Sequence, residues 1–113
     1  MSIKIYSCND SRGLRPMWTA EEMGVSYESE MMPFPPRFLH KEYMDVNILG
    51  TIPYLIDGEV EMTESVAMCQ YLVDLYGPTD LKVAIDEPDY HHYLNWLAHS
   101  DATLTFPQTV VLR

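Results

Sequence analysis

Eight prolines divide this 113-residue chain into short segments and set the places where regular elements must end. Proline lacks a backbone N–H and fixes φ, so it is excluded from helix interiors and from central strands. The three prolines within residues 33–36 therefore mark a connection, and Pro16 fits a helix only within its first turn. The segment between Pro78 and Pro88 is polar and proline-bounded, which is typical of a linker.

The residues before the connection predict a strand, a helix and a second strand. Ile3 and Ile5 alternate with Lys4 and Tyr6, which is the period of a half-buried strand. Apolar residues at helical spacing then favour a helix that begins near residues 12–15 and stops at Gly24. We expect residues 25–32 to form the second strand, parallel to the first because a helix joins the two.

A hairpin and a helix are predicted after the connection, beyond a weak helical pattern over residues 37–46. Asp57-Gly58 lies between the apolar runs Ile52–Ile56 and Val60–Met62, a strong signal for two antiparallel strands. A helix follows from Ser65 to the Gly-Pro pair at 77–78. Residues 1–78 are thus expected to form one α/β domain, 79–87 a linker, and 88–113 the first helix of an all-α C-terminal domain that the chain leaves incomplete.

The charge of the chain excludes several classes of partner. Seventeen Asp and Glu against seven Lys and Arg give a net charge of −10, which repels nucleic-acid phosphates and anionic lipid surfaces. No apolar run reaches the roughly 18 residues of a membrane span, and the first residues lack the plan of a signal peptide. The two cysteines form no CxxC pair. We therefore expect a cytoplasmic protein with neither a nucleic-acid nor a membrane partner.

Four stretches of the chain carry a resemblance to a known family: residues 4–28, 47–59 and 62–72, and the linker and helix from Pro78 onward. TIPYL, followed by Glu64-Ser65, is the most specific of their motifs. Together with the element order, these stretches resemble the thioredoxin-like βαβ-ββα domain of the cytosolic glutathione S-transferases, and the proteobacterial members look the most similar. The resemblance implies a dimeric detoxification enzyme that uses glutathione as co-substrate against a small electrophile.

The resemblance also implies where the peptide part of glutathione binds. It places a cis bond before Pro53 and docks the cysteinyl part of glutathione on the main chain of Ile52. Ser65 is a good N-cap, and the free N–H groups of the helix start suit a carboxylate, while Glu64 offers a negative partner for an amine. Together these last two residues match the zwitterionic head of the γ-glutamyl group.

Three further residues are implied by the family pattern. Basic residues that pair with the glycine carboxylate of glutathione fall near His40 and Lys41, although a solvated surface pair is an equal alternative. An acidic residue on the second-domain helix, here Asp101, reaches the glutathione amine of the partner subunit. The alternative for Asp101 is a solvated carboxylate on a slightly rotated helix.

The thiol of glutathione is expected at the break after the first strand. A hydroxyl donor at the following helix N-terminus favours the thiolate over the thiol, so Ser11 is the first candidate and Arg12 adds positive potential. The family position also fits Asp10 or Arg12. If it falls on Asp10, a carboxylate would repel the thiolate, which leaves binding intact but not transfer.

Other chemistries are weighed against transfer. Cys8 begins a CxxS string at the strand-to-helix junction, which is reminiscent of thiol–disulfide oxidoreductases. A non-catalytic glutathione-binding or scaffolding module is the other alternative. No metal site is expected, because the same-face pair His92 and His99 lies about 10 Å apart along a helix, too far for one zinc ion.

Overall fold

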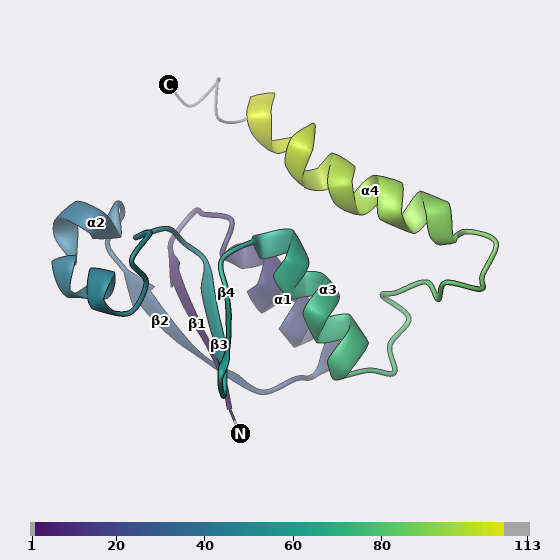
Figure 1. Cartoon of the computed structure of the whole chain (residues 1–113), viewed down its shortest axis with the longest axis horizontal. Coiled ribbons are helices and arrows are strands. Elements are labelled where there is room, and N and C mark those ends of the chain that lie inside the picture. Colours follow the sequence, from purple (N-terminus) through teal and green to yellow (C-terminus); the bar gives the residue numbers. More distant parts are fainter. Residues whose placement is uncertain (1, 108–113) are drawn as a thin grey trace. The chain divides into compact units, whose positions relative to one another are not determined.

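The computed structural model describes residues 2–107. The chain divides into two compact units, Met1–Gly77 and Pro78–Arg113, and each is described by itself. Figure 1 shows the elements of the first unit along the chain. They are β1 (Ile3–Cys8), α1 (Leu14–Met23), β2 (Tyr27–Met32), α2 (Pro36–Leu39), the 3-10 helix η1 (Lys41–Asp45), β3 (Tyr54–Asp57), β4 (Val60–Met62) and α3 (Ser65–Leu75).

The four strands form one mixed sheet in the order β2-β1-β3-β4. β1 runs parallel to β2 and antiparallel to β3, and β4 continues the sheet antiparallel to β3. The parallel pair joined by α1 and the antiparallel hairpin at the Asp-Gly turn are both as the sequence predicts. This topology confirms the thioredoxin-like βαβ-ββα arrangement.

The alternation of β1 sends its side chains to two different cores. Ile3 and Ile5 face the two long helices of the unit, which lie side by side on one face of the sheet in Figure 1. Tyr6 and Cys8 point to the other face and pack against Tyr43 of η1. The core on the helix side is completed by Ala20, Leu55, Met68 and Leu72, and the opposite core by Met32 and Tyr54.

The ends of α1 follow the predicted signals. Pro16 lies in its first turn, where a missing N–H costs no intrahelical bond. Gly24 ends the helix in the left-handed conformation, with φ at 69°, and its N–H bonds back to the carbonyls of Ala20 and Glu21.

Two predicted helices differ from the structure. The pattern over 37–46 is interrupted at His40, whose φ of −148° and ψ of 68° separate α2 from η1. The helix predicted over 88–113 is α4, which spans only Tyr90–Ala102. Proline clashes with the carbonyl four residues earlier, so Pro107 prevents a continuous helix through Thr103, and helix resumes at residues 105–107. The predicted part at 108–113 lies outside the described residues.

The second unit contains α4 and the polar stretch that precedes it. Within residues 2–107, the longest helices fall short of the length and apolar character that crossing a bilayer requires.

Candidate functional site

One end of the sheet brings together the segments that the sequence singled out. Tyr6 of β1 pairs with Tyr54 of β3, so the turn that follows β1 lies beside the residues that lead into β3. The guanidinium of Arg15, in the first turn of α1, donates a hydrogen bond from Nη1 to Ser65 Oγ at 3.1 Å. This bond joins the starts of α1 and α3. The turn with Ser11, the Ile52–Pro53 segment and the start of α3 therefore belong to one end of the unit.

The hydroxyl of Ser11 is held within its own turn. Ser11 Oγ donates to the carbonyl of Cys8 at 2.7 Å and accepts from the N–H of Gly13 at 3.2 Å. It also lies 3.2 Å from the buried Ser7 Oγ. The proton that sequence analysis assigned to a bound thiol thus points to a main-chain carbonyl. A thiolate would have to replace that carbonyl, and an ionised acceptor makes the stronger bond.

The two neighbours of Ser11 are exposed. Asp10 adopts the left-handed region with φ at 56°, which a short polar side chain tolerates in a tight turn. Arg12 extends its positive charge from the same turn. The turn therefore carries charges of both signs around Ser11.

Cys8 lies in an environment unlike that of a reactive cysteine. Its side chain is 2% exposed, and its Sγ donates to the carbonyl of Pro33 at 3.7 Å. Burial raises the pKa of the Cys8 thiol, whereas a nucleophilic cysteine needs a lowered pKa and an open approach.

The segment before β3 is fixed by residues that sequence analysis missed. The Ile52–Pro53 peptide bond is cis, and Pro53 is buried. The carbonyl of Thr51 accepts hydrogen bonds from Tyr43 Oη at 2.6 Å and Asn47 Nδ2 at 3.0 Å. Both donors are buried, and burial raises the pKa of the Tyr43 hydroxyl. They are polar groups near the proline-rich connection, yet no sequence spacing indicates that they meet Thr51.

Glu64 and Ser65 differ from the predicted cap. Ser65 is the first residue of α3 and Glu64 occupies the N-cap position, without a side-chain capping bond. Because Ser65 is already within the helix, its hydroxyl is not at the capping position, and it accepts a hydrogen bond from Arg15 instead. Ser65 is 7% exposed, while the carboxylate of the exposed Glu64 accepts a hydrogen bond from Thr63 Oγ1 at 3.0 Å. Arg15 is a further residue at this end that sequence analysis missed.

The remaining candidates lie in other segments. Half-buried His40 joins α2 to η1, and its Nδ1 is 3.8 Å from a carboxylate oxygen of Glu42. Lys41 is exposed and begins η1. Asp101 is on α4, in the second unit. The roles implied for these three residues stay predictions.

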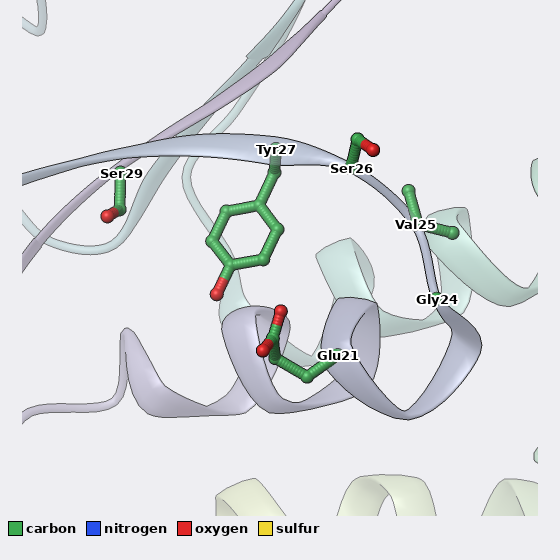
Figure 2. Close-up of a pocket in the computed structure, with 6 residues that line it drawn as sticks. All are labelled: Glu21, Gly24, Val25, Ser26, Tyr27 and Ser29. Carbon is green, nitrogen blue, oxygen red and sulfur yellow. The ribbon is translucent and has the colours of Figure 1, made fainter.

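Two of the hollows on the described part of the first unit concern the candidate site or its surroundings. Figure 2 shows the smaller, of about 460 Å³, where Glu21 and Tyr27 face one another. It lies at the C-terminal end of α1 and the beginning of β2, whereas Ser11 lies in the turn before the N-terminal end of α1. The larger, of about 600 Å³, is lined by residues 44–49 with Tyr54, Glu61 and Thr63. Since Tyr54 follows Pro53 and Thr63 precedes Glu64, the larger hollow borders the candidate site.

A metal centre has no support among the described residues. Across residues 2–107, no three His, Cys, Asp or Glu side chains are grouped so that they could hold a metal ion.

Comparison with known proteins gives consistent results. The family model "Glutathione S-transferase, N-terminal domain" matches residues 1–74. "Glutathione S-transferase 3" of Schizosaccharomyces pombe is 29% identical over 102 residues, which are 90% of this chain and 42% of that protein. A solved structure of a silkworm (Bombyx mori) glutathione transferase has a TM-score of 0.77 at 25% identity and covers 94% of this chain and 50% of the other.

A human enzyme provides a comparison with a bound ligand. The theta-class glutathione transferase, solved with the glutathione conjugate of 1-menaphthyl sulfate, has a TM-score of 0.69 at 28% identity, over 87% of this chain and 42% of that one. The chain thus spans half or less of the length of these relatives. By its fold and by the match over residues 1–74, the chain belongs to the glutathione S-transferase family through its N-terminal domain.

Proposed function

We propose that the chain binds glutathione at this end of the sheet and activates its thiol for attack on a small electrophile. The observation that carries the proposal is the convergence of three segments far apart in sequence. The pairing of β1 with β3 and the bond from Arg15 to Ser65 bring the Ser11 turn, the Ile52–Pro53 segment and the start of α3 to one place. Relatives that are solved with glutathione conjugates support the same ligand.

Each segment matches one part of the tripeptide. The main chain of Ile52 would pair with the cysteinyl residue as an added strand. The start of α3 and Ser65 would hold the α-carboxylate of the γ-glutamyl group, and the exposed Glu64 its amine. His40 and Lys41 would supply positive charge for the glycine carboxylate. Asp101 would approach the amine from a second subunit.

The chemical step requires stabilisation of the sulfur anion. Ser11 would release the Cys8 carbonyl and donate to the thiolate, while Arg12 adds positive potential. The glutathione thiol loses its proton to solvent, and the thiolate forms a carbon–sulfur bond with the electrophile. The leaving group departs with the electron pair of the broken bond, or a strained ring opens and its heteroatom takes a proton from solvent. Holding the two reactants together supplies the rest of the acceleration.

The assembly and the cellular setting are part of the same proposal. Large apolar side chains are exposed along residues 34–49, including Phe38 at 71% and Ile48 at 84%, and such a surface suits a homodimer. We place the protein in the cytoplasm, in detoxification, without a nucleic-acid or membrane partner.

One observation favours a second function. The Ser11 hydroxyl is already satisfied inside its turn, which suits a module that binds glutathione without activating it. The third alternative, disulfide exchange at Cys8, requires that buried thiol to become exposed.

Titration calorimetry with reduced glutathione tests the proposal. Glu64→Gln should weaken binding by about 10-fold or more, because it removes a charge-assisted bond to the amine. Glu59→Gln is the matched control, since it removes an exposed carboxylate on the β3–β4 turn. Ser11→Ala should keep binding and lose transferase activity. If the unaltered chain gives no heat with glutathione, the proposal fails.

A further inference from the structure

Arg15 occupies a position that links the two halves of the proposed glutathione site. Its guanidinium reaches from the first turn of α1 to the hydroxyl of Ser65, the first residue of α3. The two residues are fifty positions apart; Ser65 is almost fully buried and Arg15 is partly buried. The Ser11 turn immediately precedes α1. Arg15 therefore lies between the thiol end and the carboxylate end of the site.

The direction of this hydrogen bond determines what Ser65 can offer to a ligand. A guanidinium can only donate, so Ser65 Oγ is the acceptor in the bond with Arg15. A serine hydroxyl has one proton to donate in addition to its acceptor lone pairs. With its oxygen occupied by Arg15, Ser65 presents a donor, and the nearby positive charge adds to the positive end of the α3 dipole. An anionic ligand can accept the hydrogen bond from Ser65 and also interact favourably with the positive charge at the start of α3.

A second polar contact fixes the geometry between the two helices. One turn further along, Thr19 Oγ1 donates to the carbonyl of Arg15 at 2.9 Å and lies 3.2 Å from Cys69 Sγ. Two side-chain contacts, Arg15 with Ser65 and Thr19 with Cys69, thus follow one another along α1 and α3. The two helices run side by side in Figure 1. The start of α3 is consequently held at a set distance from the Ser11 turn.

We infer that Arg15 is the positioning residue that makes this site select ligands with a γ-glutamyl α-carboxylate, by holding Ser65 as a donor and adding positive charge at the start of α3. This inference rests on the proposed function. It differs from a purely structural role for Arg15 in one measurable respect. If Arg15 only maintained the structure, its substitution would weaken the binding of all ligands alike. If Arg15 selects for the carboxylate, its substitution weakens the binding only of ligands that carry the carboxylate.

The test compares reduced glutathione with γ-aminobutyryl-cysteinyl-glycine, which lacks only that carboxylate. Both are titrated calorimetrically into the full chain and its variants. In the unaltered chain, loss of the carboxylate should weaken binding by about 10- to 100-fold, as expected for a charge-assisted pair. The quantity compared is the Kd of the analogue divided by the Kd of glutathione. In Arg15→Gln, which keeps an amide donor but no charge, this ratio should fall below about threefold, chiefly because glutathione itself binds more weakly. Arg15→Lys keeps the charge and should keep part of the ratio.

Thr19→Val is the matched control, because it removes the neighbouring contact between Thr19 and Cys69 without changing any charge. It should leave the ratio as in the unaltered chain, and thermal melts of each variant show that it is folded. An unchanged ratio in Arg15→Gln overturns the inference alone. Equal binding of both ligands to the unaltered chain overturns the inference and also the proposed place of the α-carboxylate at Ser65, while binding of glutathione itself stands. Absence of any binding of glutathione overturns the proposed function and this inference together.

Discussion

Gly13→Ala is the substitution whose effect the structure predicts with the clearest sign. Gly13 precedes α1 with φ at −60° and ψ at −21°, a conformation that alanine adopts readily. Backbone considerations alone would therefore predict stabilisation by roughly 0.4–1 kcal/mol. However, a Cβ on Gly13 would lie 1.7 Å from Ser7 Oγ and 2.6 Å from Ser7 Cβ. Both separations are far inside van der Waals contact.

The size of the effect follows from the burial of Ser7. That side chain is fully buried on β1, so it cannot swing into solvent, and a clash with its Cβ requires the strand itself to move. Overpacking of this kind costs about 1–3 kcal/mol, and the contact between Ser7 and Ser11 is lost in addition. We expect the free energy of unfolding to fall by about 2–4 kcal/mol, measured by urea denaturation followed by circular dichroism.

Two controls separate crowding from backbone strain. Gly24→Ala meets no atom within 4 Å but places alanine at φ +69°, so it should cost only about 1–2 kcal/mol. Gly13→Ala combined with Ser7→Gly removes the atoms that clash and should recover part of the lost stability. The reasoning is refuted if Gly13→Ala is neutral or stabilising, or if the added Ser7→Gly recovers nothing.

Three further predictions concern buried polar groups. Asp57 is 4% exposed, and its Oδ2 accepts hydrogen bonds from Tyr71 at 2.7 Å and Tyr76 at 2.6 Å. Tyr71→Phe and Tyr76→Phe should each lower the free energy of unfolding by about 1.5–3 kcal/mol in urea titrations, and additive effects in the double variant would contradict a shared carboxylate. Burial raises the pKa of Tyr71 to about 12, and burial with the hydrogen bond to Glu61 does the same for Tyr54. The folded state keeps these protons, whereas the unfolded tyrosines release theirs near pH 10. The free energy of unfolding should therefore be unchanged below about pH 10 and fall toward pH 12. Tyr71→Phe should reduce this dependence on pH, as measured by urea denaturation at a series of pH values. Cys8 should resist a thiol-alkylating reagent in the native chain and react after unfolding, as followed by mass spectrometry, and rapid native labelling would refute its burial.

The sequence predicts those parts of the fold that are determined by local residue patterns. The alternation of Ile3 and Ile5 with their neighbours defines both faces of β1, since a strand sends successive side chains to opposite sides. Asp57-Gly58 predicts the β3–β4 turn because few residue pairs tolerate that backbone. Gly24 ends α1 for the same reason, with its positive φ. Each of these signals acts within a few residues of its own position.

What sequence analysis misses depends on contacts between distant residues. Ser65 reads as an N-cap by its type, but Arg15, fifty residues away, engages its hydroxyl. Sequence analysis predicts Ser11 as the thiol donor, but it gives no sign that the Ser11 hydroxyl donates to the carbonyl of Cys8. Thr51 is anchored by Tyr43 and Asn47 through a loop with no periodic pattern. None of these partners can be inferred from spacing along the chain.

The most direct test of glutathione activation is the pKa of the glutathione thiol in the complex. It can be measured from the ultraviolet absorbance of the thiolate as a function of pH, with the full chain in excess over glutathione. A free cysteine thiol has a pKa of about 8.5, and the proposed role of Ser11 predicts that the pKa of the bound thiol is lower by at least about one unit. Ser11→Ala should return it toward the free value while glutathione stays bound. An unshifted pKa in the unaltered chain, with binding intact, would contradict activation and leave a glutathione-binding module.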